Sequence, residues 1–150
     1  MKATVTYAWF VLLSIIACLQ KVNGGHGDTR LQVAVRNKDV DLVKRLLASP
    51  WNSTDVKATN KYGKTALMIA AGDGSTKIIE LLLPNSDVKA TDAYGDTALN
   101  YAAWNENEKS LELLLPNSDV KATNNNGYSA LMDAAAYGNE KSLELLLPIF

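Results

Sequence analysis

The chain has 150 residues, of which 47% are hydrophobic and 21% are charged, a length that suits one ordinary domain. Its 15 basic and 16 acidic side chains give a net charge of −1, which argues against a nucleic-acid-binding face with clustered basic residues. The single cysteine and single histidine exclude an intramolecular disulfide framework, a thiolate zinc cluster and a multi-histidine metal site. We therefore expect no enzyme, no cofactor and no metal.

The N-terminal segment, residues 1–24, is predicted to be a secretory signal peptide. Lys2 precedes an apolar run at residues 8–19, which is shorter than the roughly 20 residues that a membrane-spanning helix needs. Two processing sites stay open. Ile15-Ile16-Ala17-Cys18 is similar to the lipobox of bacterial lipoproteins, which would make Cys18 a lipidated N-terminus, and cleavage after Gly24 would release a secreted chain. Either site predicts an exported protein, while a buried helix and an uncleaved anchor are the alternatives.

The rest of the chain is an internal repeat with a period of 32 residues. Asp55-Val56-Lys57-Ala58-Thr59 recurs unchanged at 87–91 and at 119–123, a periodicity typical of a solenoid. Residues 29–50 match only the helical half of a block and are more polar, as a terminal cap should be. The predicted organisation is a tether at 25–28 and a repeat domain at 29–150, made of a cap (29–54) and three repeats (55–86, 87–118 and 119–150).

Each block predicts a turn, a helix, a second turn and a second helix. In the first block Gly63 permits the positive φ of a tight turn, and Thr65 is placed to cap a helix N-terminus. Leu67, Ala70 and Ala71 follow on one helical face. A proline after a Leu-Leu-Leu run ends the second helix of every block, at Pro84, Pro116 and Pro148.

The repeated pattern resembles the ankyrin repeat, through Asp-Val-Lys-Ala, Gly-Lys-Thr-Ala-Leu-Met-x-Ala-Ala and Ile-Ile-Glu-Leu-Leu-Leu in the first block. The resemblance implies an all-α solenoid of helix-turn-helix units with hairpin-type tips. The sequence departs from the family at its histidine, which is replaced by Met68, Asn100 and Met132, so we expect most of that residue's hydrogen bonds to be missing. Glu106 replaces the glycine between the helices, where a left-handed backbone would cost about 1 kcal/mol.

The resemblance also implies a protein-binding surface, because the family binds partners with its tips and the exposed side of its first helices. The positions carried over are Lys61, Tyr62, Lys64, Asp73, Tyr94, Asp96, Trp104, Asn105, Asn125, Asn126, Tyr128 and Tyr137, with Ala93 and Ala136 beside them. Tyr and Trp are enriched at interface hot spots, and we expect Tyr94 and Trp104 to be exposed. Asp73, Asp96 and Asp133 are interpreted as solvated surface charges, and their convergence on the concave side is the alternative.

These features predict a non-catalytic protein-interaction module that is exported and has an unidentified protein partner. Membrane contact is expected only through a lipid on Cys18, giving a periplasmic or cell-surface lipoprotein, or else the protein is secreted. The alternative is a structural or envelope-assembly protein that acts by end-to-end stacking. The last block keeps the interior apolar pattern through Leu145, Ile149 and Phe150, so we expect fraying or self-association at residues 128–150.

Overall fold

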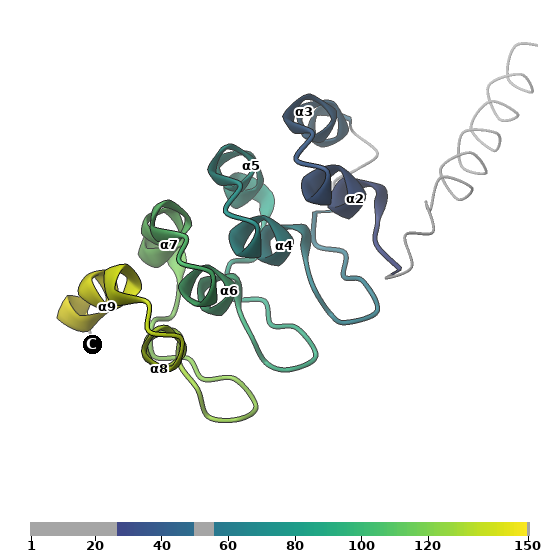
Figure 1. Ribbon diagram of the computed structural model, residues 1–150. Helices are drawn as coiled ribbons and strands as arrows, with labels where there is room; N and C mark the ends of the chain where they lie inside the picture. Colours follow the sequence, from purple (N-terminus) through teal and green to yellow (C-terminus); the bar gives the residue numbers. More distant parts are fainter. Residues whose placement is uncertain (1–26, 50–55, 150) are drawn as a thin grey trace, which may run out of the picture.

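The computed structural model describes residues 27–49 and 56–149. The described residues form four helix pairs, and short 3-10 helices extend the last three pairs (Figure 1). The helices are α2 (Arg30–Arg36), α3 (Val40–Ala48), α4 (Ala66–Gly72), α5 (Thr76–Leu82), η1 (Leu83–Asn85), α6 (Ala98–Trp104), α7 (Glu108–Leu114), η2 (Leu115–Asn117), α8 (Ala130–Ala136), α9 (Glu140–Leu146) and η3 (Leu147–Ile149).

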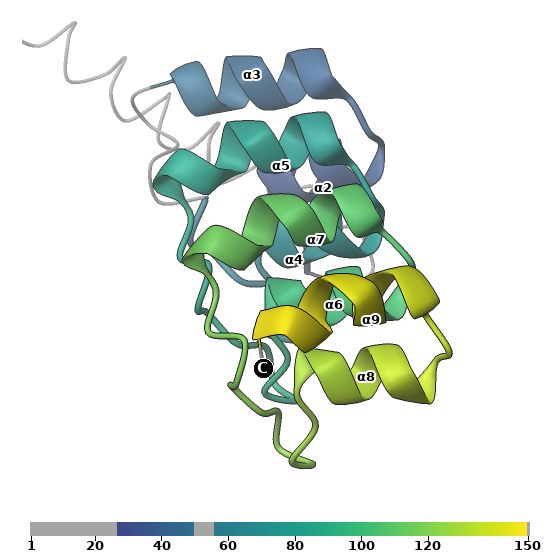
Figure 2. The ribbon, with the colours of Figure 1, turned by 90° about the vertical axis from the view of Figure 1, so that its left-hand side faces the viewer.

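The pairs stack into two rows of helices. The inner row contains α2, α4, α6 and α8, the outer row contains α3, α5, α7 and α9, and the loops before the inner helices project away from both rows (Figures 1 and 2). Small residues on the inner helices, such as Ala70 and Ala102, are fully buried. Leucines and isoleucines of the outer helices, such as Ile79 and Leu111, pack on them. The core therefore runs along the whole array between the rows.

A hydroxyl caps the N-terminus of every inner helix. Thr29, Thr65, Thr97 and Ser129 each accept a hydrogen bond from the backbone N–H three residues later. The expected loss of hydrogen bonds where the family has its histidine is wrong for Asn100, whose Oδ1 accepts the N–H of Thr97, three residues earlier, at 3.1 Å. An amide oxygen on this short side chain reaches back to the cap and completes a capping box.

The projecting loops are hairpin-type tips, although the described residues contain no β-strand and only one isolated bridge pair, Thr123 with Ser129. Gly63, Gly95 and Gly127 adopt positive φ values of 77°, 82° and 80°. Successive tips are joined by backbone bonds of 3.0 Å, from Ala93 N–H to Tyr62 O and from Asn125 N–H to Tyr94 O.

The turn between the helices of a pair also needs a left-handed residue. Glu106 has a φ of 55°, as predicted from its alignment with Gly74 and Gly138, and Lys38 has a φ of 56° in the first pair. The next residue in two of the turns is an asparagine that binds the preceding pair. The Nδ2 group of Asn107 donates to Ala71 O at 3.2 Å, and that of Asn139 donates to Ala103 O at 2.8 Å.

The N-terminal predictions fall mostly outside the described residues, which exclude Cys18 and the signal segment. Asp28, assigned above to the tether, is only 4% exposed and accepts hydrogen bonds from Asn60 and Arg36. It therefore belongs to the folded array. Within 27–49 and 56–149, no helix is long and apolar enough to span a bilayer.

Candidate functional site

A hollow of about 670 Å³ lies between the tips and the inner helices α6 and α8. We call it the concave groove. It is lined by Lys64, Tyr94, Asp96, Tyr101, Trp104, Asn124, Asn126, Tyr128, Asp133, Ala136 and Tyr137. Seven of the twelve predicted contact positions are among these residues, namely Lys64, Tyr94, Asp96, Trp104, Asn126, Tyr128 and Tyr137. The repeat therefore brings residues about 70 positions apart in the sequence to one surface.

Aromatic side chains form the walls of the concave groove. Tyr94, Tyr128 and Tyr137 are 58%, 47% and 65% exposed. The expectation that Trp104 is exposed is wrong, because its side chain is half-buried and its indole N–H has no acceptor among the described residues. Its ring packs edge-on against Tyr101 at 4.9 Å and lies 6.2 Å from Tyr137, so the indole joins the core to the open surface.

Two buried carboxylates lie on the floor of the concave groove. The interpretation of Asp96 and Asp133 as solvated charges is wrong, since their residues are only 3% and 4% exposed, whereas Asp73 is exposed as expected. Amide groups of a neighbouring repeat partly compensate for their burial. Asn124 Nδ2 donates to Asp96 Oδ1 and Asn100 Nδ2 donates to Asp133 Oδ2, both at 2.7 Å.

The pKa of Asp96 is raised above its ordinary value. Burial is the main cause, and the neighbouring carboxylates Asp92 and Asp133 add to it. The hydrogen bond from Asn124 and the charge of Lys64 act in the opposite direction. The surroundings therefore disfavour the ionised form of Asp96 relative to a carboxylate in water.

A third carboxylate, Asp92, hydrogen-bonds to three residues that line the concave groove. Its Oδ1 accepts the N–H groups of Tyr94 and Asp96, and its Oδ2 accepts the phenol O–H of Tyr101 at 2.7 Å. Burial and the Asp92 carboxylate raise the pKa of Tyr101 far above its ordinary value. The Lys64 ammonium sits over the Tyr101 ring, 4.4 Å from its centroid.

Sequence reasoning missed Tyr101 and Asn124 as groove residues and favoured a solvated surface charge for Asp133, which lines the groove. Tyr101 and Asp133 occupy the same repeat position as Ile69, which is buried in the core, so the position looks structural in the first repeat. The available signal was the change of this position from apolar to polar along the array. When one repeat position changes from an apolar to a polar residue, its side chain is expected to have different neighbours in the later repeats.

Five predicted contact positions do not line the concave groove. Lys61 and Tyr62 lie on the first tip, where the ammonium is 4.9 Å from the ring centroid. Asp73 follows the end of α4, and Asn105 follows α6, where its Nδ2 donates to Tyr101 O. Asn125 is exposed and its Nδ2 donates to Ala93 O. The side-chain amides of Asn105 and Asn125 therefore hydrogen-bond to the backbone of a helix end and of a neighbouring tip.

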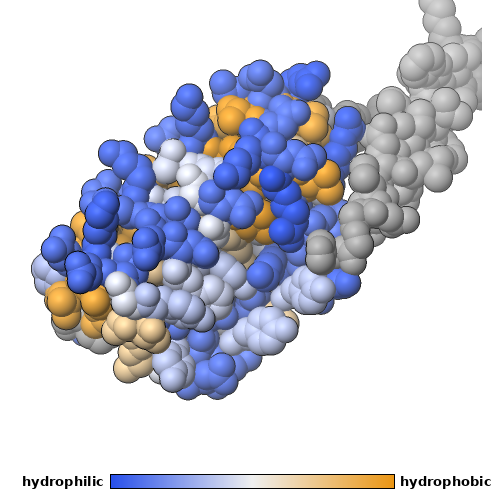
Figure 3. Space-filling view, in the orientation of Figure 1, coloured by the Kyte–Doolittle hydropathy of each residue, from blue (hydrophilic) through white to orange (hydrophobic). Residues whose placement is uncertain are grey.

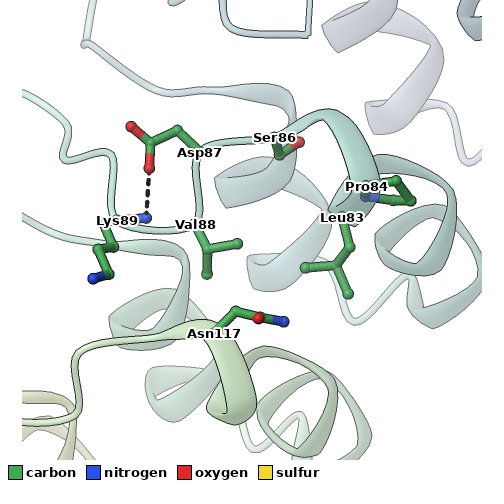
Figure 4. A pocket seen from close by; sticks show the side chains of 7 residues that line it. All are labelled: Leu83, Pro84, Ser86, Asp87, Val88, Lys89 and Asn117. Atoms are coloured by element: carbon green, nitrogen blue, oxygen red, sulfur yellow. Dashed lines mark hydrogen bonds between the residues drawn. The ribbon is translucent and has the colours of Figure 1, made fainter.

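A second hollow, of about 510 Å³, lies where η1 and the turn after it approach Asn117 of the next repeat (Figure 4). One carboxylate, Asp87, and one ammonium, Lys89, line it beside Leu83, Pro84 and Val88. The Oδ1 atom of Asp87 accepts the backbone N–H of Lys89 at 3.0 Å. Its polar groups thus shape the turn, and no aromatic residue lines it.

The described residues contain no group of three His, Cys, Asp or Glu side chains that could hold a metal ion. A family model described as ankyrin repeats in three copies matches residues 31–124. The chain belongs to the ankyrin-repeat family. A search of curated proteins finds no match to this ankyrin-repeat chain. Ankyrin repeats generally mediate protein–protein interaction and are typically non-catalytic. The concave groove is therefore the candidate protein-binding surface.

Proposed function

We propose that this ankyrin-repeat protein is a non-catalytic recognition module that binds a protein partner in the concave groove. The observation that supports it is the exposure of Tyr94, Tyr128 and Tyr137 together around one hollow. Exposed tyrosines offer a large contact area at a low cost in conformational entropy. In Figure 3, many residues over the inner helices and the tips have intermediate hydropathy, while the outer row shows strongly hydrophilic residues with hydrophobic patches between them.

The half-buried Trp104 gives the proposed interface a rigid centre. Its ring is packed between Tyr101 and Tyr137, so little side-chain freedom remains to be lost when a partner covers it. Binding hot spots are typically aromatic anchors in well-packed surroundings with exposed side chains around them. The three tyrosines provide these surroundings.

A random-peptide display on the immobilised full chain tests this function. We expect peptides selected on the wild type to bind at least about ten-fold more weakly to a Tyr94→Ala/Tyr128→Ala/Tyr137→Ala variant, because each truncation at a hot spot costs about 1–3 kcal/mol. The control replaces the exposed outer-row residues Lys77 and Glu112 by alanine. Peptides that bind the tyrosine variant as well as the wild type would refute the role of the groove.

We also propose that the protein works outside the cytosol, held to a membrane by a lipid on Cys18. The support is the sequence alone: the only cysteine of the chain ends the apolar run and follows Ile15-Ile16-Ala17. In the native host, Cys18→Ser should move the protein from the membrane fraction to the soluble fraction or block its processing. Unchanged fractionation with a mature N-terminus at Gly25 would instead indicate a secreted protein.

A further inference from the structure

The floor of the concave groove is acidic and incompletely hydrogen-bonded. Asp96 and Asp133 each have one oxygen bound to an asparagine amide at 2.7 Å. Their other oxygens, Asp96 Oδ2 and Asp133 Oδ1, accept no hydrogen bond from any residue in 27–49 or 56–149. Neither oxygen is among the buried atoms that lack a partner, so both are open to the groove, and a ligand with several donors can reach them.

The walls of the concave groove favour a cation. Aromatic faces attract ammonium and guanidinium groups, and the structure contains one example, the Lys64 ammonium 4.4 Å from the Tyr101 ring centroid. The same groove is lined by two carboxylates, Asp96 and Asp133, and Asp92 lies behind them, hydrogen-bonded to the Tyr101 hydroxyl. The groove thus keeps an excess of negative charge after its own lysine is counted, which disfavours phosphate and acidic peptides.

Resting on the function proposed above, we propose that the partner inserts an arginine side chain into the concave groove, against the carboxylates of Asp96 and Asp133. The planar guanidinium presents five N–H donors and also stacks on aromatic rings. It therefore suits a site with two free carboxylate oxygens beside Trp104 and Tyr137. A lysine ammonium, being a compact and strongly hydrated charge, uses the flat aromatic wall less well.

Three peptides that differ in one side chain test this specificity. They are acetyl-Gly-Gly-Arg-Gly-Gly-amide, the same peptide with citrulline, which is neutral and nearly isosteric, and the same peptide with lysine. Their binding is followed by NMR on the ¹⁵N-labelled full chain, at the Trp104 indole N–H, which is assigned with Trp104→Phe. We expect the arginine peptide to bind at least about ten-fold more tightly than either of the others.

The carboxylates are tested with an Asp96→Asn/Asp133→Asn variant. These isosteric amides keep the size of the floor and remove its charge, so the arginine peptide should lose its advantage over the citrulline peptide. The matched control is Asp73→Asn, since Asp73 is exposed and lies outside the concave groove. Amide spectra of each variant establish that it is folded before it is titrated.

Each contrary outcome overturns the inference in a distinct way. Equal affinity for the arginine and citrulline peptides, or an unchanged advantage in the double variant, would exclude a carboxylate-bound cation. Equal affinity for the lysine peptide would exclude the guanidinium. If displayed peptides need the three tyrosines but carry no arginine, this inference fails while the proposed function stands. If they bind the tyrosine variant fully, the proposed function fails first.

Discussion

Glu106 shows how a single residue limits the stability of the array. It has a φ of 55° at the repeat position that Gly74 and Gly138 occupy. A side chain with a Cβ is strained in this left-handed conformation by about 1 kcal/mol, although glycine also loses more entropy on folding. We expect Glu106→Gly to raise the free energy of unfolding by about 0.5–1 kcal/mol, measured by urea denaturation.

The opposite substitution at the same repeat position provides the control. Gly138 has a φ of 68°, and a Cβ added there would meet no heavy atom within 4 Å. Gly138→Ala should therefore lower the free energy of unfolding by about 1 kcal/mol through the backbone alone. If both substitutions destabilise the protein, the left-handed turn is not the source of strain at Glu106.

The raised pKa of Asp96 predicts a dependence of stability on pH. Burial is its main cause, and Asp92 and Asp133 add to it, so the folded state binds this proton more tightly than the unfolded state does. The contribution of Asp96 to stability is then lost as the pH rises from 3.8 through the folded-state pKa. We expect Asp96→Asn to be more stable than the wild type at neutral pH, and this difference to shrink in acid.

Thermal unfolding of the wild type and the variant between acid and neutral pH measures this difference. Asp73→Asn serves as a control, because its side chain is exposed and the change should leave the pH profile nearly parallel to that of the wild type. A gain for Asp96→Asn that is the same at every pH would show that the ionised carboxylate is not the cause.

At the scale of an element, asparagines join one helix pair to the next. Asn139 is 2% exposed, donates to Ala103 O at 2.8 Å and accepts the N–H of Ser142 at 3.2 Å. Asn139→Ala would leave both buried groups without this partner, so we expect a loss of about 1–3 kcal/mol. Chemical denaturation measures it, with α8 and α9 expected to lose amide protection first.

Ser75 occupies the same repeat position as Asn139 and gives a matched comparison. Its hydroxyl is buried and has no hydrogen-bond partner among the described residues, so Ser75→Ala removes an unsatisfied polar atom. We expect that variant to be neutral or slightly more stable than the wild type. Equal losses at both positions would mean that residue size, not the amide bond, matters there.

The helix pairs could be predicted from the sequence because each is encoded locally. Gly63 requires a turn, Thr65 caps the helix that follows, and three copies in register leave little ambiguity. The groove was harder to predict because burial depends on the neighbouring repeat. Nothing in its own repeat shows that Asp133 is buried, since the amide that it binds belongs to Asn100, one repeat earlier.

At the scale of the whole molecule, the array leaves an apolar surface at α9 and η3, seen as hydrophobic residues at the left-hand end in Figure 3. Leu83 and Leu115 are half-buried at this repeat position, whereas Leu147 is 61% exposed. Ile149 is 49% exposed at the position that the earlier repeats fill with asparagine. Water therefore contacts side chains that an adjoining surface would bury.

We expect the 150-residue chain to self-associate weakly through this end. Burying one such side chain contributes about 1.5–3 kcal/mol, so Leu147→Lys/Ile149→Lys should weaken any dimer by at least about ten-fold without unfolding the rest of the array. Sedimentation velocity over a range of concentrations measures it. Asn85→Lys/Asn117→Lys adds the same charge at exposed asparagines and should leave the dimer nearly unchanged. If both variants lower association equally, net charge rather than the apolar end controls it, and a wild type that stays monomeric throughout would show that this surface does not bind its own copy.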